Sequence, residues 1–171
     1  TYTGLTLINE GTVRLGSGSA LGASGTADNG TQIAAGGTLD LNGQNAQNER
    51  ISVAGTITNT GADQTNALRY VTLSGNATFT GTARWDIRGT NGNLDGQLVL
   101  AGFTATKSGT NTLGIIDTTI TGPGGITINE GTVILARSSW TNGALTANSG
   151  TTVWFSYNTG SYSYQMNMVV N

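Results

Sequence analysis

The sequence has no cysteine and no histidine, and only 7 basic and 9 acidic residues. Without these side chains there is no Cys/His metal site, no Ser-His-Asp triad and no thiol chemistry. A net charge of −2 removes the electrostatic basis for binding nucleic acid. No apolar run approaches the roughly 18 residues that span a membrane, so we expect no membrane insertion by this segment.

The residues that are present favour strands over helices. Gly, Thr, Asn and Ser make up about half of the 171 residues, a composition that forms helices poorly. Disorder is not expected either, because hydrophobic residues reach 36%. The length suits one domain. The N-terminus has no start Met and no signal pattern, so we expect a processed or excised segment.

Short runs in which every second residue is apolar recur along the whole chain. This alternation is typical of β-strands, whereas no helical stripe is present. Examples are Val13-Arg-Leu15, Leu39-Asp-Leu41, Ile51-Ser-Val53, Val71-Thr-Leu73, Trp85-Asp-Ile87 and Val133-Ile-Leu135.

Repetition at the length of one coil distinguishes between all-β folds. Gly-Thr steps introduce many of the runs, often about 18 to 26 residues apart, and Ile8-Asn-Glu-Gly-Thr-Val13 recurs as Ile128-Asn-Glu-Gly-Thr-Val133. Such a period predicts a β-solenoid of about seven or eight coils, which share one core and pair in parallel. A β-sandwich is the competing fold, and the coil-length repeat disfavours it.

Two segments resemble the autotransporter-associated β-strand repeat. The first is Thr1-Tyr-Thr-Gly4 with Ile8–Gly16 and Ser19–Gly22, and the second is Gly124–Leu135 with Gly143–Leu145. The resemblance implies a right-handed parallel β-helix that is secreted or lies on the bacterial surface. It implies a stalk or spacer and brings no catalytic residues.

The chain divides into solenoid repeats at residues 1–145 and an aromatic, Met-rich segment at 146–171. Alternation puts five apolar residues of that segment on one strand face, and we expect them either to continue the solenoid or to form a joint with another subunit. Neither terminus has a capping helix, so open strand edges favour association. The expected interface residues are Tyr162, Tyr164, Met166, Met168 and Val170 at one end and Tyr2, Leu5 and Leu7 at the other.

These observations predict a structural role. The expected protein is an extracellular bacterial β-solenoid that stacks head to tail into a stalk or fibre, with its partner either another copy or neighbouring repeats of the same chain. One alternative is an adhesin that binds glycan or host protein through exposed aromatic residues, with Trp140 and Tyr157 as candidates. A further alternative is a carbohydrate-active β-helix enzyme, which would need paired carboxylates. No catalytic residue and no cofactor is expected.

Three other patterns are interpreted as structural. Arg84, Asp86 and Arg88 alternate with Trp85 and Ile87, which predicts exposed charges over buried apolar groups. The aspartates are scattered singly, so no metal site is expected. Thr-x-Thr steps such as Thr56/Thr58 and Thr78/Thr80 could order water against ice, but their spacing along the chain is irregular.

Overall fold

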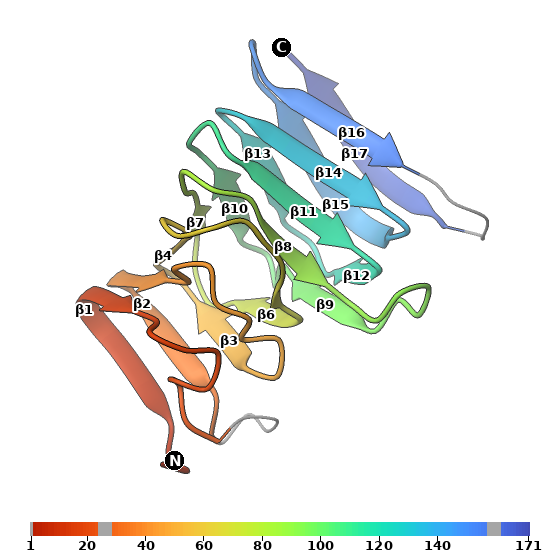
Figure 1. Cartoon of the computed structure of the whole chain (residues 1–171). Helices are drawn as coiled ribbons and strands as arrows, with labels where there is room; N and C mark the ends of the chain where they lie inside the picture. The colour runs from red at the N-terminus through yellow and green to blue at the C-terminus, as the bar shows by residue number, and fades with distance from the viewer. Residues whose placement is uncertain (1, 24–28, 157–161) are drawn as a thin grey trace.

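The computed structural model describes residues 2–23, 29–156 and 162–171. The described residues contain strands and no α-helix. The strands form a parallel β-solenoid of about seven turns, consistent with a right-handed parallel β-helix. Figure 1 shows the turns following one another from the N-terminus at one end to the C-terminus at the other. The all-β solenoid predicted from the alternation and the coil-length repeat is therefore confirmed.

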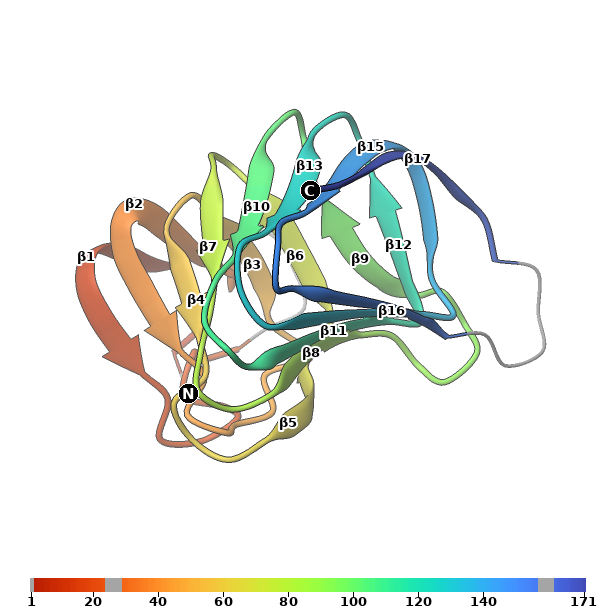
Figure 2. The ribbon, with the colours of Figure 1, turned by 90° about the horizontal axis from the view of Figure 1, so that it is seen from above.

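Each complete turn contributes a strand to each of three faces, which surround the core (Figure 2). The first face contains β3 (Arg50–Val53), β6 (Tyr70–Leu73), β9 (Gly96–Val99) and β12 (Thr118–Thr121). The second contains β4 (Thr56–Thr58), β7 (Ala77–Phe79), β10 (Thr104–Lys107) and β13 (Gly125–Ile128). The third contains β5 (Gln64–Leu68), β8 (Trp85–Arg88), β11 (Thr112–Ile116), β14 (Thr132–Ala136) and β16 (Thr152–Ser156).

The four longest strands join the first face to the second. For example, β15 pairs with β12 through its first residues and with β13 through its last. The first and second faces are therefore one continuous sheet near both ends of the coil. These strands are β1 (Thr6–Arg14), β2 (Thr31–Asp40), β15 (Ser139–Ala147) and β17 (Tyr164–Val170).

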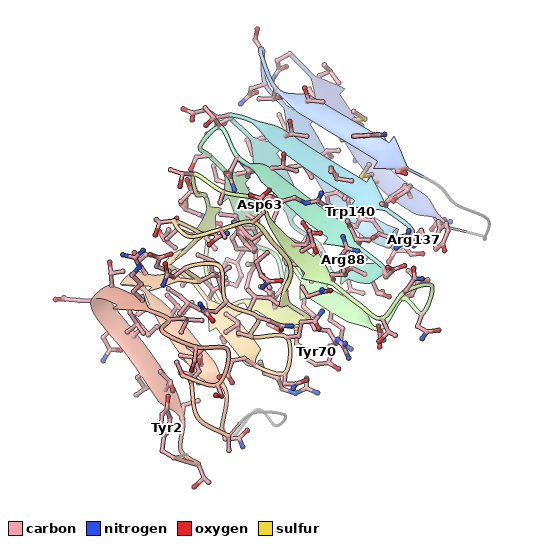
Figure 3. The ribbon with its side chains drawn as sticks, in the orientation of Figure 1. Tyr2, Asp63, Tyr70, Arg88, Arg137 and Trp140 are labelled. Carbon is pink, nitrogen blue, oxygen red and sulfur yellow. The ribbon has the colours of Figure 1, made fainter. Side chains whose placement is uncertain are left out.

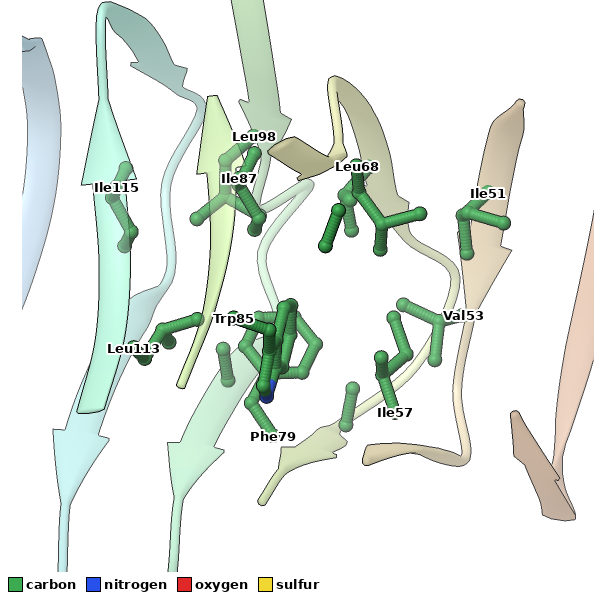
Figure 4. Packing of buried hydrophobic residues seen from close by; sticks show 14 of the residues in the cluster. Ile51, Val53, Ile57, Leu68, Phe79, Trp85, Ile87, Leu98, Leu113 and Ile115 are labelled. Carbon is green, nitrogen blue, oxygen red and sulfur yellow. The ribbon is translucent and has the colours of Figure 1, made fainter. Parts of the chain in front are cut away.

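Parallel pairing in register stacks equivalent residues into columns that run along the coil. The core is built from the inward columns, and the apolar alternation of the sequence matches it: Val71 and Leu73 are buried, as are Trp85 and Ile87. Phe79 meets Trp85 edge to face, with ring centroids 5.4 Å apart, and links the second face to the third (Figure 4). Such aromatic pairs stabilise a fold by about 0.5–1.5 kcal/mol beyond the area that they bury.

One inward column of the second face increases in side-chain size along the coil. It begins with glycines in the first three turns, passes through alanines and ends in large apolar residues. Gly37 and Gly55 lie closely against the backbone of the neighbouring turn, and the space for side chains in this column increases toward the C-terminal end. The column consists of Gly11, Gly37, Gly55, Ala77, Ala105, Ile126, Leu145 and Met168.

The closely packed glycines at the N-terminal end of this column predict that an added side chain there destabilises the fold. A Cβ atom at Gly55 would collide with the backbone carbonyl oxygens of Ala34 and Gly37, whereas a Cβ at Gly16 would meet nothing within 4 Å. We expect Gly55→Ala to lower the free energy of unfolding by about 1–3 kcal/mol, the usual cost of overpacking. Urea denaturation measures the change, with Gly16→Ala as the matched control. Equal stability of the two variants would contradict this packing.

Candidate functional site

The C-terminal end of the coil is an open strand edge. Strand β17 pairs with β15 on one side and with no other strand among the described residues. Its register continues the core columns, because Tyr164 follows Trp140, Met168 follows Leu145 and Val170 follows Ala147. Met168 is 45% exposed and Val170 is 70% exposed, since no described strand covers the outer edge of β17.

The alternation expected for the last segment is present, with burial that falls toward the chain end. Tyr162, Tyr164 and Met166 are half-buried, and Tyr164 and Met166 pack against the core. The segment therefore continues the solenoid, and its outermost residues form the open end. Whether that end joins another subunit stays a prediction.

The N-terminal end is also an open strand edge, because β1 pairs with β2 and with no other strand among the described residues. Ile8, Leu15 and Leu21 are buried although they belong to the first turn, whereas Val13, which begins an inward column, is partly exposed. The expected interface residues Leu5 and Leu7 are exposed, but they lie on the outer side of the first face.

Tyr2 lies beside the first turn. Its ring packs over Gly22, and its hydroxyl lies 2.7 Å from the Thr6 hydroxyl (Figure 3). Tyr2, Leu5 and Leu7 would therefore flank a joint at this end, while Val13 would lie within it.

The expectation that Trp140 is an exposed aromatic is wrong. Its side chain is 0% exposed, because β15 pairs in register with β12 and β17 and places Trp140 between Ile120 and Tyr164 in an inward column. Its indole nitrogen has no hydrogen-bond partner within the described residues and lies against Gly143. The other candidate, Tyr157, lies outside the described residues.

The exposed tryptophan is Trp154, which was not predicted as a site. It is 60% exposed on β16 and stands on the outer side of the third face, in register with Ile134 and Gly114. Trp154 directly precedes the inward-facing Phe155 on the same strand, so the alternation of the sequence is a signal that could have indicated an outward Trp154.

The Arg84–Asp86–Arg88 strand differs from its expectation in one respect. Asp86 points outward but is fully buried, because both arginines close over it and it lies above Gly114. Arg84 donates through Nε and Nη2 at 2.8 and 3.0 Å, and Arg88 through the same atoms at 3.2 and 2.6 Å. The hydrogen bonds with Asp86 raise the pKa of Arg84. A carboxylate with four such bonds is a structural clamp and not an accessible acid or base.

Several other acids are also held by neighbouring side chains. Asp117 accepts two hydrogen bonds from Arg137, at 2.7 and 2.6 Å, and Asp40 lies 3.4 Å from Arg14. Burial raises the pKa of Glu49, which accepts a hydrogen bond from the Thr31 hydroxyl. Within the described residues, no three acids gather into a group that could hold a metal ion. No helix there is long and apolar enough to cross a membrane.

Lys107 is a charged residue within the core. Its side chain is fully buried in an inward column between Phe79 and Ile128. The ammonium donates to the backbone carbonyls of Ser108, Gly109 and Glu130 at 3.0, 2.6 and 3.2 Å, which uses all three of its donors. Burial lowers the pKa of Lys107 from 10.5 to about 8, against the opposing attraction of Glu130.

The lowered pKa predicts a stability that depends on pH. Between pH 8 and 10.5 the unfolded chain holds a proton on Lys107 that the folded chain has released, so stability rises with pH across this interval. The rise is about 2–3 kcal/mol, from about 1.4 kcal/mol per pH unit. Urea denaturation at several pH values measures it, and Lys107→Met, which keeps an unbranched apolar chain in the column, lacks this contribution. The same slope in both proteins would contradict the assignment.

Comparison with protein-family models, with curated proteins and with solved structures gives no match. The resemblance to the autotransporter-associated repeat therefore stays a prediction from sequence.

Proposed function

We propose that this chain is a structural module of an extracellular bacterial stalk or fibre, and that it extends by stacking its coil end to end on a second copy. The observation that carries the proposal is the open C-terminal edge, where β17 pairs with β15 alone among the described strands and Met168, Val169 and Val170 are exposed. Unpaired strand edges recruit further strands. The extracellular location rests on the sequence resemblance alone.

The column from Gly11 to Met168, in which side-chain size increases along the coil, supports a contact between unlike ends of two copies. If β1 of a second copy followed β17 in the same register, Met168 would stand over Gly11 and Val170 over Val13. The largest residue of the column would then fit against its smallest, whereas two C-terminal ends would bring large residues together. Contacts between unlike ends give open filaments.

Charges at the C-terminal end test the proposal directly. We expect the wild type to form filaments with an axial repeat of about 38 Å, from the eight strand positions of each column at about 4.8 Å each. Met168→Asp with Val170→Asp would bury unpaired charge in the joint and abolish them. Electron microscopy and sedimentation are the measurements. The matched control is Thr72→Asp with Gln97→Asp, which adds the same charge to exposed positions midway along the coil.

Blocking the opposite end makes the test directional. Val13→Asp alone should also abolish filaments, and a mixture of this variant with the C-terminal double variant should give dimers and nothing longer. Circular dichroism shows whether each variant folds. A wild type that stays monomeric at high concentration, or a double variant that still elongates, would refute the end-to-end joint.

Trp154 supports adhesion to glycans as a second candidate function. An exposed tryptophan face offers a flat apolar surface, here beside Ile134 on an otherwise regular sheet. A glycan array should show binding that Trp154→Ala removes, while Tyr2→Ala, which truncates an exposed aromatic near the other end, leaves it unchanged. A well-folded wild type that binds no glycan would rule this function out.

A further inference from the structure

A column of threonines runs along the outer side of the second face. Strand pairing places threonine in register in seven successive turns, and Val169 takes the eighth position. The intervals along the chain range from 18 residues to 28, so the column arises from the strand register and not from regular sequence spacing. We call it the threonine ladder: Thr12, Thr38, Thr56, Thr78, Thr106, Thr127 and Thr146.

The hydroxyl groups of the ladder are available for an external partner. None of the seven makes a hydrogen bond within the described residues. Each can donate one hydrogen bond and accept two. Branching at Cβ restricts the χ1 rotamers of threonine, and the strand register repeats equivalent ladder positions at the strand spacing of about 4.8 Å.

The columns on either side of the ladder are neutral from the third turn onward. On one side they carry Thr58, Thr80, Ser108, Asn129 and Asn148, of which Asn148 donates to Asn129 at 2.8 Å. On the other side they carry small or polar residues, namely Ala54, Asn76, Thr104, Gly125 and Ala144. From Thr56 onward these three columns contain no charged side chain. The charged residues Glu10, Arg14 and Asp40 lie in the first two turns, where Arg14 pairs with Asp40.

We propose that the threonine ladder binds the surface of ice. Rows of water oxygens in hexagonal ice repeat at nearly the spacing of parallel strands, so ladder hydroxyls can take the places of successive waters. From Thr56 onward the neutral face matches an ice surface, because ice offers no opposite charge with which Lys, Arg, Asp or Glu could pair. The ladder spans about 29 Å, six steps of about 4.8 Å. Its rigidity means that little ordering entropy is lost on contact.

The test measures ice growth directly. Wild-type protein should shape ice crystals and show thermal hysteresis in a nanolitre osmometer. Thr106→Tyr raises a ring above the centre of the face and should lose most of the hysteresis. Thr72→Tyr makes the same change at an exposed, outward position of the first face and should keep it. Circular dichroism and urea denaturation confirm that both variants fold.

A gain of function gives an independent check. Val169→Thr extends the ladder by one position, at the exposed strand β17, and should increase hysteresis at equal molar concentration. A wild type without ice shaping or hysteresis overturns the proposal. So does equal hysteresis in the two tyrosine variants. If the wild type instead associates side by side, and Thr106→Tyr alone abolishes that association, the face is a contact between copies and the ice proposal is wrong. None of these outcomes depends on whether the ends of the coil join.

Discussion

The in-register parallel ladder between successive turns is the interaction on which the rest of this structure depends. A single turn has only three short strands and cannot bury its apolar side chains, so each turn is stable only against its neighbours. Backbone hydrogen bonds fix which residue lies above which, as when Ile51 stands beside Val71 and Val71 beside Leu98. Loops of different lengths leave the faces intact because they lie between the registered strands.

In-register pairing stacks residues from successive turns into columns. Some features of the molecule exist only in these columns and in no single turn. In the column from Gly11 to Met168, side-chain size increases from one end of the coil to the other. The threonine ladder collects seven scattered hydroxyls into one row. Lys107 fits into a core column because its methylene chain packs as an apolar side chain would. Its ammonium donates to three backbone carbonyls that would otherwise need water as a donor. Among the described residues, β1 and β17 each pair on one side only, so the same arrangement leaves an open strand edge at both ends of the coil.

The fold was predictable from the sequence because alternation and coil-length repetition are local signals. Val71 with Leu73 and Trp85 with Ile87 lie inward as their spacing indicates, and the last segment alternates as expected. The failures concern contacts between turns. Trp140 was expected to be exposed because its partner column, from Ile120 to Tyr164, exists only once the coils are aligned.

The other unpredicted features have the same origin. Asp86 is covered by arginines on its own strand only because the next turn has glycine at position 114. The threonine ladder was hidden by loops that vary the interval between equivalent positions. Lysine is rarely buried, so the sequence alone does not predict an inward Lys107. Its burial depends on carbonyl acceptors from its own turn and from the next turn, which only the aligned coils bring together.

A distance between two outward positions tests the register most directly. Thr38 and Thr146 lie five turns apart in one column, although 108 residues separate them in the chain. Both can be replaced by cysteine and spin-labelled. Pulsed electron paramagnetic resonance should give one narrow distribution centred near 24 Å between the attachment points, at about 4.8 Å per turn. A broad distribution, or a centre far from that value after correction for the label length, would contradict the stacked-coil account.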